Sequence, residues 1–332
     1  MKVLITGGAG YLGSVITYAF LDRGHDVVII DKTEDTGEFD IPGCYFYHGD
    51  ISDKALLEKI FAEHGDIEIL IHCADRGSVF DSVYRPYEFY MTNVVITMEL
   101  FKNLRDLGLR KIIFASSAAV YDNVPGYMVT EQSPIKPRSP FGRSKYITEM
   151  ILKDFCDAYD MKCITLRYFN PIGADPQGRC GKSYAKGNII SGLVNVMAGR
   201  ESCFVISGDD WDTRDGTCVR DYIHIWDVAM ANVLAAEHFD TAFDKAGRDF
   251  TDYLSLNIGS GIDVTVREFI SAFENVTGEK IPVKIGPRRK GDISGSYANI
   301  RRAEHTIGWK PTFVVENAIM DYLSWLENNE NL

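Results

Sequence analysis

The chain begins with Met1-Lys-Val-Leu-Ile-Thr-Gly-Gly-Ala-Gly-Tyr-Leu-Gly13, and this stretch decides the fold. Residues 2–6 are mostly aliphatic or β-branched and predict a short buried strand that ends at the glycines. An apolar run with helical spacing follows over residues 12–21. A glycine turn between a strand and a helix lets the backbone approach a pyrophosphate at the helix N-terminus, so we predict a dinucleotide site.

A second predicted strand, residues 27–30, ends in Asp31, 18 residues after Gly13. A carboxylate at this position accepts hydrogen bonds from a ribose diol and repels a 2′-phosphate, which favours NAD over NADP. The alternative is a strand, turn and helix with no ligand. The turn supplies five candidate cofactor-binding residues: Gly7, Gly10, Tyr11, Leu12 and Gly13.

Composition excludes several classes of protein. A net charge of −12 over 332 residues argues against a nucleic-acid binder. Seven scattered cysteines without a CxxC pair indicate reduced thiols and no metal site. Neither a signal peptide nor a membrane-spanning run is evident, so we expect a cytoplasmic protein.

Strands and helices alternate along the first half of the chain, which predicts an α/β fold with a doubly wound parallel sheet of the Rossmann type. Further strands are expected at 44–48, 67–72, 111–115 and 161–168, and helices at 88–107 and 139–159. Ligands of such sheets bind at the carboxyl ends of the strands. We predict an NAD-binding domain over residues 1–169 and a smaller α/β substrate lobe over 170–332, partly interleaved with it, with a last helix at 314–327.

Several motifs resemble the extended short-chain dehydrogenase/reductases. They are the glycine turn, Ser116-Ser-Ala-Ala-Val-Tyr121 and Ser139-Pro-Phe-Gly-Arg-Ser-Lys145. Leu166-Arg-Tyr-Phe-Asn-Pro-Ile-Gly-Ala174, Asp215-Gly-Thr-Cys-Val-Arg-Asp-Tyr-Ile-His224 and Pro287-Arg-Arg-Lys-Gly-Asp292 narrow the resemblance to the UDP-glucose 4-epimerase group. It covers essentially the whole chain. Ala118-Ala119 stands where related dehydratases carry an acid, which argues against that activity.

The resemblance implies a catalytic set. In the family a tyrosine takes the proton of the sugar 4-hydroxyl while NAD accepts a hydride, and the hydride then returns to the other face of the keto sugar. A lysine lowers the tyrosine pKa and anchors the nicotinamide ribose, and a serine hydrogen-bonds the reacting oxygen. Lys145 and Ser117 match the lysine and the serine, whereas Phe141 occupies the tyrosine position.

Phe141 leaves three explanations open. The first is an introduced substitution that traps substrate. The second is a natural change of chemistry, in which Ser117 acts through water or Tyr121 acts as the base. The third is a protein that binds NAD and a nucleotide sugar without turnover, and an epimerase or reductase on another nucleotide sugar is a further alternative.

The resemblance also implies ligand contacts. Beyond the turn, the expected cofactor-binding residues are Asp31, Asp50, Ile51, Ala74, Asn93, Ser116, Lys145 and Tyr168. Asp50 would reach the adenine amino group, or else cap the helix that starts near Asp53. The expected substrate-binding residues are Ser117, Asn170, Asn188, Arg220, Arg289, Asp292 and Ser296.

Two arginines of this set, Arg220 and Arg289, would grip the diphosphate of a UDP-sugar. Ser296 stands where narrow-pocket relatives have a tyrosine, so we expect room for UDP-N-acetylhexosamines as well as UDP-glucose and UDP-galactose. Two departures qualify the match. Asp75-Arg76-Gly77 replaces a Gly-x-Lys, with Arg76 a candidate to take over from the lysine, and Ser207 replaces an aromatic near the base. The helices at 88–107 and 139–159 resemble those of a homodimer interface, with Phe89, Leu100, Ile147 and Ile151 as candidate contacts.

Overall fold

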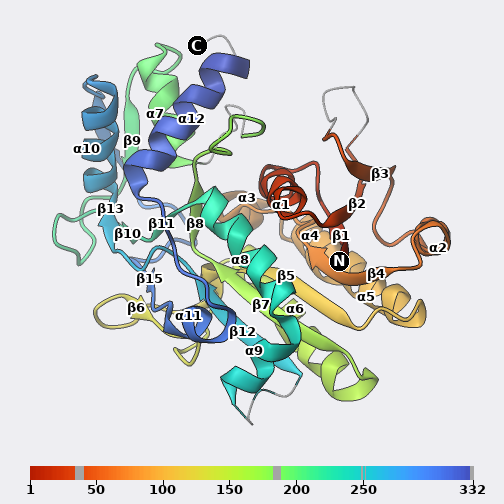
Figure 1. Ribbon diagram of the computed structural model, residues 1–332. Helices are drawn as coiled ribbons and strands as arrows, with labels where there is room; N and C mark the ends of the chain where they lie inside the picture. Colours follow the sequence, from red (N-terminus) through yellow and green to blue (C-terminus); the bar gives the residue numbers. More distant parts are fainter. Residues whose placement is uncertain (34–40, 182–187, 248–249, 251, 330–332) are drawn as a thin grey trace.

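The computed structural model describes residues 1–33, 41–181, 188–247, 250 and 252–329. The sequence also predicts a polar segment over residues 32–40 and a loop over residues 170–187, and part of each lies outside the described residues. Within them, seven strands form one sheet in the order β12-β7-β5-β4-β1-β2-β3, and every pairing is parallel (Figure 1). The strands are β1 (Lys2–Thr6), β2 (Asp26–Asp31), β3 (Cys44–His48), β4 (Ile67–His72), β5 (Lys111–Ser117), β7 (Lys162–Tyr168) and β12 (Tyr253–Ile258).

Alternation along the strands sends apolar side chains to both faces of this sheet. Val3 and Ile5 of β1 enter one hydrophobic cluster, and Leu4 between them enters the other. The helices that cover the first face are α1 (Tyr11–Asp22), α8 (Ile225–Glu237), α9 (Phe239–Ala246) and α11 (Arg301–Ile307). Those that cover the second are α2 (Lys54–Glu63), α5 (Thr97–Asp106) and α6 (Pro140–Tyr159). The predicted doubly wound fold is confirmed.

A third hydrophobic cluster forms the core of the smaller lobe, which lies at one end of the molecule (Figure 1). Its helices are α7 (Ile189–Met197), α10 (Val266–Thr277) and α12 (Val315–Asn329). Its two-stranded pairs are β8 (Asn170–Ile172) with β11 (Tyr222–His224), β9 (Phe204–Ser207) with β14 (Val283–Gly286), and β10 (Val219–Arg220) with β13 (Val264–Thr265). The chain therefore crosses between the two bodies several times after residue 169, because α8, α9, β12 and α11 return to the sheet.

The remaining elements join the two bodies near the carboxyl ends of the strands. Strand β6 (Met128–Val129) pairs with β15 (Tyr297–Ala298), a short 3₁₀ turn covers Ala118–Val120, and α3 (Val79–Tyr84) follows β4. None of the helices in the described part of the chain combines the length and apolarity needed to cross a bilayer.

The predicted helix over residues 88–107 is present as a continuous helical run, but its middle part is π-helical. The structure has α4 (Pro86–Tyr90), a π-helical segment (Met91–Ile96) and then α5. Thr97 Oγ1 donates to the Thr92 carbonyl at 3.2 Å, and Asn93, inside the π segment, is buried and bonded to neighbouring elements. Such segments often occur at functional sites.

Candidate active site

The glycine turn packs against the end of β4. Gly7 has φ of +72°, and a Cβ added there would lie 2.7 Å from Ala74 Cα. A Cβ on Gly13 would lie 2.1 Å from the Gly7 carbonyl oxygen. At Gly10 the nearest atom to an added Cβ is the Gly7 oxygen at 3.3 Å. The first and last glycines therefore serve close backbone packing, and the middle one is less crowded.

The turn fits a dinucleotide. Gly10 is the N-cap of α1, no side chain of the described residues caps this end, and no acidic residue stands in the first helical turn. The N-terminus is thus available to an anionic group. Asp31, only 8% exposed, ends β2 beside the turn, where its carboxylate accepts from Ala9 N at 3.0 Å and from Thr33 N at 2.9 Å.

Other predicted cofactor residues have contacts within the protein. Asp50 is exposed and accepts from Ser52 N and Oγ at 2.9 and 2.7 Å, whereas Asp53 caps α2 through Ala55 N and Leu56 N. The predicted capping role of Asp50 is therefore wrong, because the residue lies one turn too early. Ile51 is buried beside it. The adenine contact of Asp50 stays a prediction.

Three more of these side chains lie at the first hydrophobic cluster. Leu12 packs against it, and the Tyr11 hydroxyl donates to the Gly173 carbonyl at 2.7 Å, which joins the turn to the smaller lobe. The Tyr168 hydroxyl donates to Asn232 Oδ1 at 2.8 Å. Burial raises the pKa of both phenols, so both are neutral donors.

Asn93 holds the segment that follows β4. Its amide accepts from Arg76 N at 2.9 Å and donates to the Arg76 carbonyl and to Ser144 Oγ at 3.2 and 3.1 Å. The Arg76 guanidinium lies 3.5 Å from Glu88. Asn93 therefore fixes the backbone of residue 76 against α6.

Ser116 and Ser117 end β5, where their side chains have different partners. Ser116 Oγ donates to Glu149 Oε1 at 2.6 Å, and Glu149 forms a buried ion pair with Arg167, whose nearest N–O distance is 2.6 Å. Ser117 is half-buried, and its hydroxyl accepts from Ala119 N at 3.2 Å. Of the two serines, Ser117 is therefore the more exposed and the one that a ligand can reach.

Lys145 and Phe141 lie one turn apart on α6. The Lys145 ammonium is buried, and it donates to the Ala115 carbonyl at 2.6 Å. It lies 5.9 Å from the centre of the Phe141 ring and 5.0 Å from that of Phe114. Phe141 is 9% exposed and packs edge-on against Phe89 at 6.4 Å between ring centres. The predicted lysine, serine and phenylalanine positions thus gather at the carboxyl end of β5.

Asp75 joins this group, and sequence reasoning missed it. Its Oδ2 lies 2.7 Å from Lys145 Nζ, and its side chain is one-quarter exposed. The substitution of Asp75-Arg76-Gly77 for the family pattern was the available signal. Seventy residues separate the two partners, so the pairing could not be read from the chain.

Tyr121 is excluded as the replacement base. Its hydroxyl donates to Asn257 Oδ1 at 2.6 Å and accepts from Arg167 at 2.9 Å, and its side chain is 1% exposed. Burial raises the pKa of Tyr121 to about 12, so the phenol keeps its proton at neutral pH.

Most of the predicted substrate residues belong to the smaller lobe or to segments that join it. Arg220 ends β10, donates to the Ile293 carbonyl at 3.1 Å and lies 3.8 Å from Asp292. Arg289 is exposed on the loop that follows β14 and leads to Asp292. A Cβ on Gly291 would lie 3.4 Å from Ser139 Cβ, so this loop reaches the N-terminus of α6, next to Phe141.

The other members of the set are placed by the lobe. Asn170 begins β8, and its backbone N–H donates to the Asp221 carbonyl. Asn188 caps α7 by accepting from Ile190 N at 3.1 Å. Ser296 is 7% exposed, just before β15. Their ligand contacts stay predictions.

An aromatic lies close to Ser207 despite the departure there. The Trp211 indole N–H donates to the Ser207 carbonyl at 3.1 Å, and the Arg288 guanidinium lies 4.0 Å from the Trp211 ring centre. The end of β9 therefore carries a planar ring and a cation, although Ser207 itself is small.

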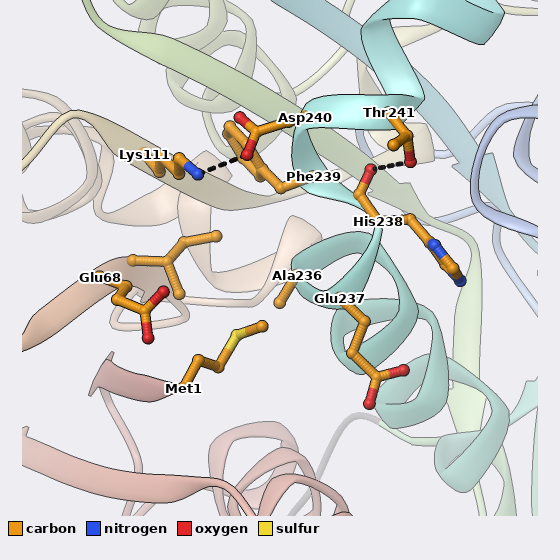
Figure 2. Close-up of a pocket in the computed structure, with 10 residues that line it drawn as sticks. Met1, Glu68, Lys111, Ala236, Glu237, His238, Phe239, Asp240 and Thr241 are labelled. Atoms are coloured by element: carbon orange, nitrogen blue, oxygen red, sulfur yellow. Dashed lines mark hydrogen bonds and ion pairs between the residues drawn. The ribbon is translucent and has the colours of Figure 1, made fainter.

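A pocket of about 200 Å³ lies at the opposite edge of the sheet (Figure 2). Met1, Glu68 and Lys111 line it, and these residues stand at the starts of β1, β4 and β5. Lys111 pairs with Asp240 across its wall at 2.7 Å. Because ligands of parallel sheets bind at the carboxyl ends, this pocket is separate from the candidate active site. Among the described residues, no three His, Cys, Asp or Glu side chains cluster as a metal site.

Comparison with known proteins agrees with this geometry. Residues 3–251 match the NAD dependent epimerase/dehydratase family. The chain belongs to this family. UDP-glucose 4-epimerase of Halalkalibacterium halodurans is 37% identical over 94% of the chain and 91% of its own length. That of Erwinia amylovora is 34% identical over 99% of the chain and 98% of its own length.

Solved structures of epimerases superpose over nearly the whole chain. The UDP-glucose 4-epimerase from Stenotrophomonas maltophila, with bound NAD and formylated UDP-arabinopyranose, has a TM-score of 0.90 and 34% identity, covering 99% of this chain and 98% of its own. The enzyme from Bifidobacterium longum, in complex with NAD⁺ and UDP, has a TM-score of 0.87 and 33% identity, covering 100% and 99%. The glycine turn of this epimerase/dehydratase family member thus lies in a fold that holds NAD in its relatives.

Proposed function

We propose that the chain catalyses the NAD-dependent 4-epimerisation of a UDP-sugar, with UDP-glucose and UDP-galactose as the first candidates. One observation carries the proposal. Lys145 and Ser117 gather with a cradle for a dinucleotide at the carboxyl end of the sheet, in a chain that resembles UDP-glucose 4-epimerases from end to end.

The roles follow from the side chains. The N-terminus of α1 holds the pyrophosphate of NAD, and Asp31 accepts from its ribose diol. The Lys145 ammonium anchors the nicotinamide ribose of NAD, and the Ser117 hydroxyl donates a hydrogen bond to the reacting sugar oxygen. When bound, NAD supplies an acceptor for the hydride of carbon 4 and later its donor. Arg220 and Arg289 hold the diphosphate.

Phe141 limits the expected rate. A phenyl ring in this position has no proton to exchange, and a positioned general base is typically worth about 10²–10⁴ in rate, or about 3–5 kcal/mol of barrier. Turnover therefore requires another acceptor at the site, or else it is slow.

Ser296 defines a test of the sugar. A small side chain leaves room for an N-acetyl group, and the UDP-Glc/GlcNAc 4-epimerase of Campylobacter jejuni, 30% identical, is named for both sugars. We expect Ser296→Tyr to lower the affinity for UDP-N-acetylglucosamine at least tenfold and to leave that for UDP-glucose within twofold, measured by calorimetry. An unchanged affinity of the variant for UDP-N-acetylglucosamine would refute the assignment.

A different nucleotide sugar is the second candidate. Formylated UDP-arabinopyranose and UDP-glucuronic acid appear in the names of two related structures, the second being MoeE5 at 25% identity. Product identification with a panel of UDP-sugars separates this candidate from the first. Stable binding of NAD and UDP-sugar without any product, also after Phe141→Tyr, would instead favour a binding protein.

Two properties accompany the proposal. We place the protein in the cytoplasm.

We also propose a homodimer through α4, the π segment, α5 and α6. Exposed apolar side chains on these elements support the dimer, namely Tyr87, Val95, Met98 and Met150. Of the expected contacts, Phe89 and Leu100 are buried in the protomer itself, and Ile147 and Ile151 are half-buried on the same surface.

Deuterium at carbon 4 of UDP-galactose tests the reaction. In the proposed cycle the label returns to the same sugar, so the UDP-glucose formed keeps its deuterium in water, without added NADH. Loss of label to solvent, or product only with added reductant, would exclude the internal cycle.

A further inference from the structure

Two departures from the family pattern meet at one ammonium group. Phe141 removes the phenol that faces Lys145, and Asp75, where the family has glycine, brings a carboxylate to 2.7 Å from Lys145 Nζ. We infer that Asp75 is the catalytic base of this chain, the group that accepts the proton of the sugar 4-hydroxyl. The inference rests on the proposed epimerase function.

The charges at the site support this assignment. Lys145 is buried between the rings of Phe114 and Phe141, and besides Asp75 only the Ala115 carbonyl accepts from its ammonium within the described residues. A buried ammonium needs a partner of opposite charge. In the family the tyrosinate supplies a negative charge during the reaction, and here Asp75 carries it.

The position of Asp75 in the fold also suits a catalytic base. It follows Ala74, which packs against Gly7 of the cofactor turn, and it lies at the carboxyl end of β4, next to the end of β5 that carries Ser117. Its Oδ2 faces Lys145, no described residue donates to its Oδ1, and a quarter of the side chain is exposed. A free carboxylate oxygen is thus accessible beside the ammonium that orients the site.

The alternative oxygens are less suitable. Tyr121 is buried, and its hydroxyl is hydrogen-bonded to Asn257 and Arg167. Ser117 carries a hydroxyl that would itself need a base. A carboxylate can take the proton directly, as general bases of this type do in many enzymes.

The step balances in protons and electrons. The O–H bond at carbon 4 breaks, its proton passes to the Asp75 carboxylate, and the hydride of carbon 4 passes to the oxidised nicotinamide. The products are a keto sugar, a neutral Asp75 and the reduced cofactor. The reverse transfers, to the other face of the sugar, restore Asp75 and the cofactor.

The test compares four proteins: the unmodified chain, Asp75→Asn, Phe141→Tyr and the double variant. We expect Asp75→Asn to lower kcat by about 10²–10⁴, with the dissociation constant of UDP unchanged within twofold by calorimetry. Phe141→Tyr in the Asp75→Asn background should raise kcat at least tenfold over that of Asp75→Asn alone, because the phenol supplies another acceptor for the sugar proton. Infrared difference spectra on mixing with UDP-galactose should show a protonated carboxyl band that Asp75→Asn lacks.

Asp66→Asn is the matched control. Asp66 precedes β4 and pairs with Lys2 at 2.8 Å on the surface, so the same chemical change at the other end of the strand should leave kcat unaltered. Full activity of Asp75→Asn would overturn the inference and leave the epimerase intact. So would an unmodified chain that is inactive while Phe141→Tyr is active. If both the unmodified chain and Phe141→Tyr are inactive on all UDP-sugars tested, the proposed function itself fails.

Discussion

Gly13→Ala places a methyl group where the turn has no room. The added Cβ would lie 2.1 Å from the Gly7 oxygen and 2.8 Å from both Gly7 C and Gly8 Cα, all of them backbone atoms. Gly7 is held by a hydrogen bond from its N–H to the Ile30 carbonyl at 3.0 Å and accepts from Gly10 N at 3.1 Å. Relief therefore requires one of these bonds to break or the helix to move away from the strand.

The magnitude follows from opposing terms. Overpacking costs about 1–3 kcal/mol, and one lost hydrogen bond costs about 0.5–1.5 kcal/mol. Alanine in the helix gains about 0.5–1 kcal/mol over glycine. We expect a net loss of about 0.5–4 kcal/mol in the free energy of unfolding, measured by urea denaturation without added cofactor, together with loss of NAD binding by calorimetry.

Gly65→Ala is the control, since its added Cβ meets only the Phe61 oxygen, at 3.6 Å. It should change the stability by less than about 0.5 kcal/mol. Wild-type stability and NAD affinity in Gly13→Ala would refute the close-packing argument.

Three further predictions concern buried side chains near the carboxyl ends of the strands. Glu149→Gln leaves the buried Arg167 without its counter-charge and should cost about 3–5 kcal/mol in urea denaturation; a loss below 1 kcal/mol would contradict it. Burial and the charge of Lys145 lower the pKa of His72 to about 3, so the unfolded chain takes up a proton below pH 6.5 that the folded one does not. Stability should therefore fall by about 2 kcal/mol from this group between pH 7.5 and pH 5, and His72→Gln should lack that part of the slope. Asp31→Ser should weaken NAD binding and improve NADP binding, measured by fluorescence titration; unchanged preference would exclude Asp31 from the ribose site.

The sequence predicted the elements correctly where short-range sequence patterns determine the structure. Residues 2–6 and 67–72 became strands as predicted, because an apolar run that ends at glycine or a polar residue has few other solutions. The boundaries of α6 were also predicted to within a residue, because Ser139 caps the helix and Pro140 opens it.

Contacts between distant segments were beyond this reasoning. The π segment at Met91–Ile96 depends on Asn93 reaching Arg76 and Ser144, which no periodicity reports. The pair of Asp75 and Lys145 depends on the order of β4 and β5 in the sheet. Motifs identified the lysine and the serine, whereas the partner that distinguishes this site came from the three-dimensional arrangement.

The most direct measurement is the proton NMR spectrum of UDP-galactose incubated with the purified chain and NAD. The anomeric signal of UDP-glucose should appear, and the two sugars should reach the same ratio from either starting side. Binding of UDP and NAD with no change in the sugar, in both the unmodified chain and its Phe141→Tyr variant, would contradict the proposed epimerisation.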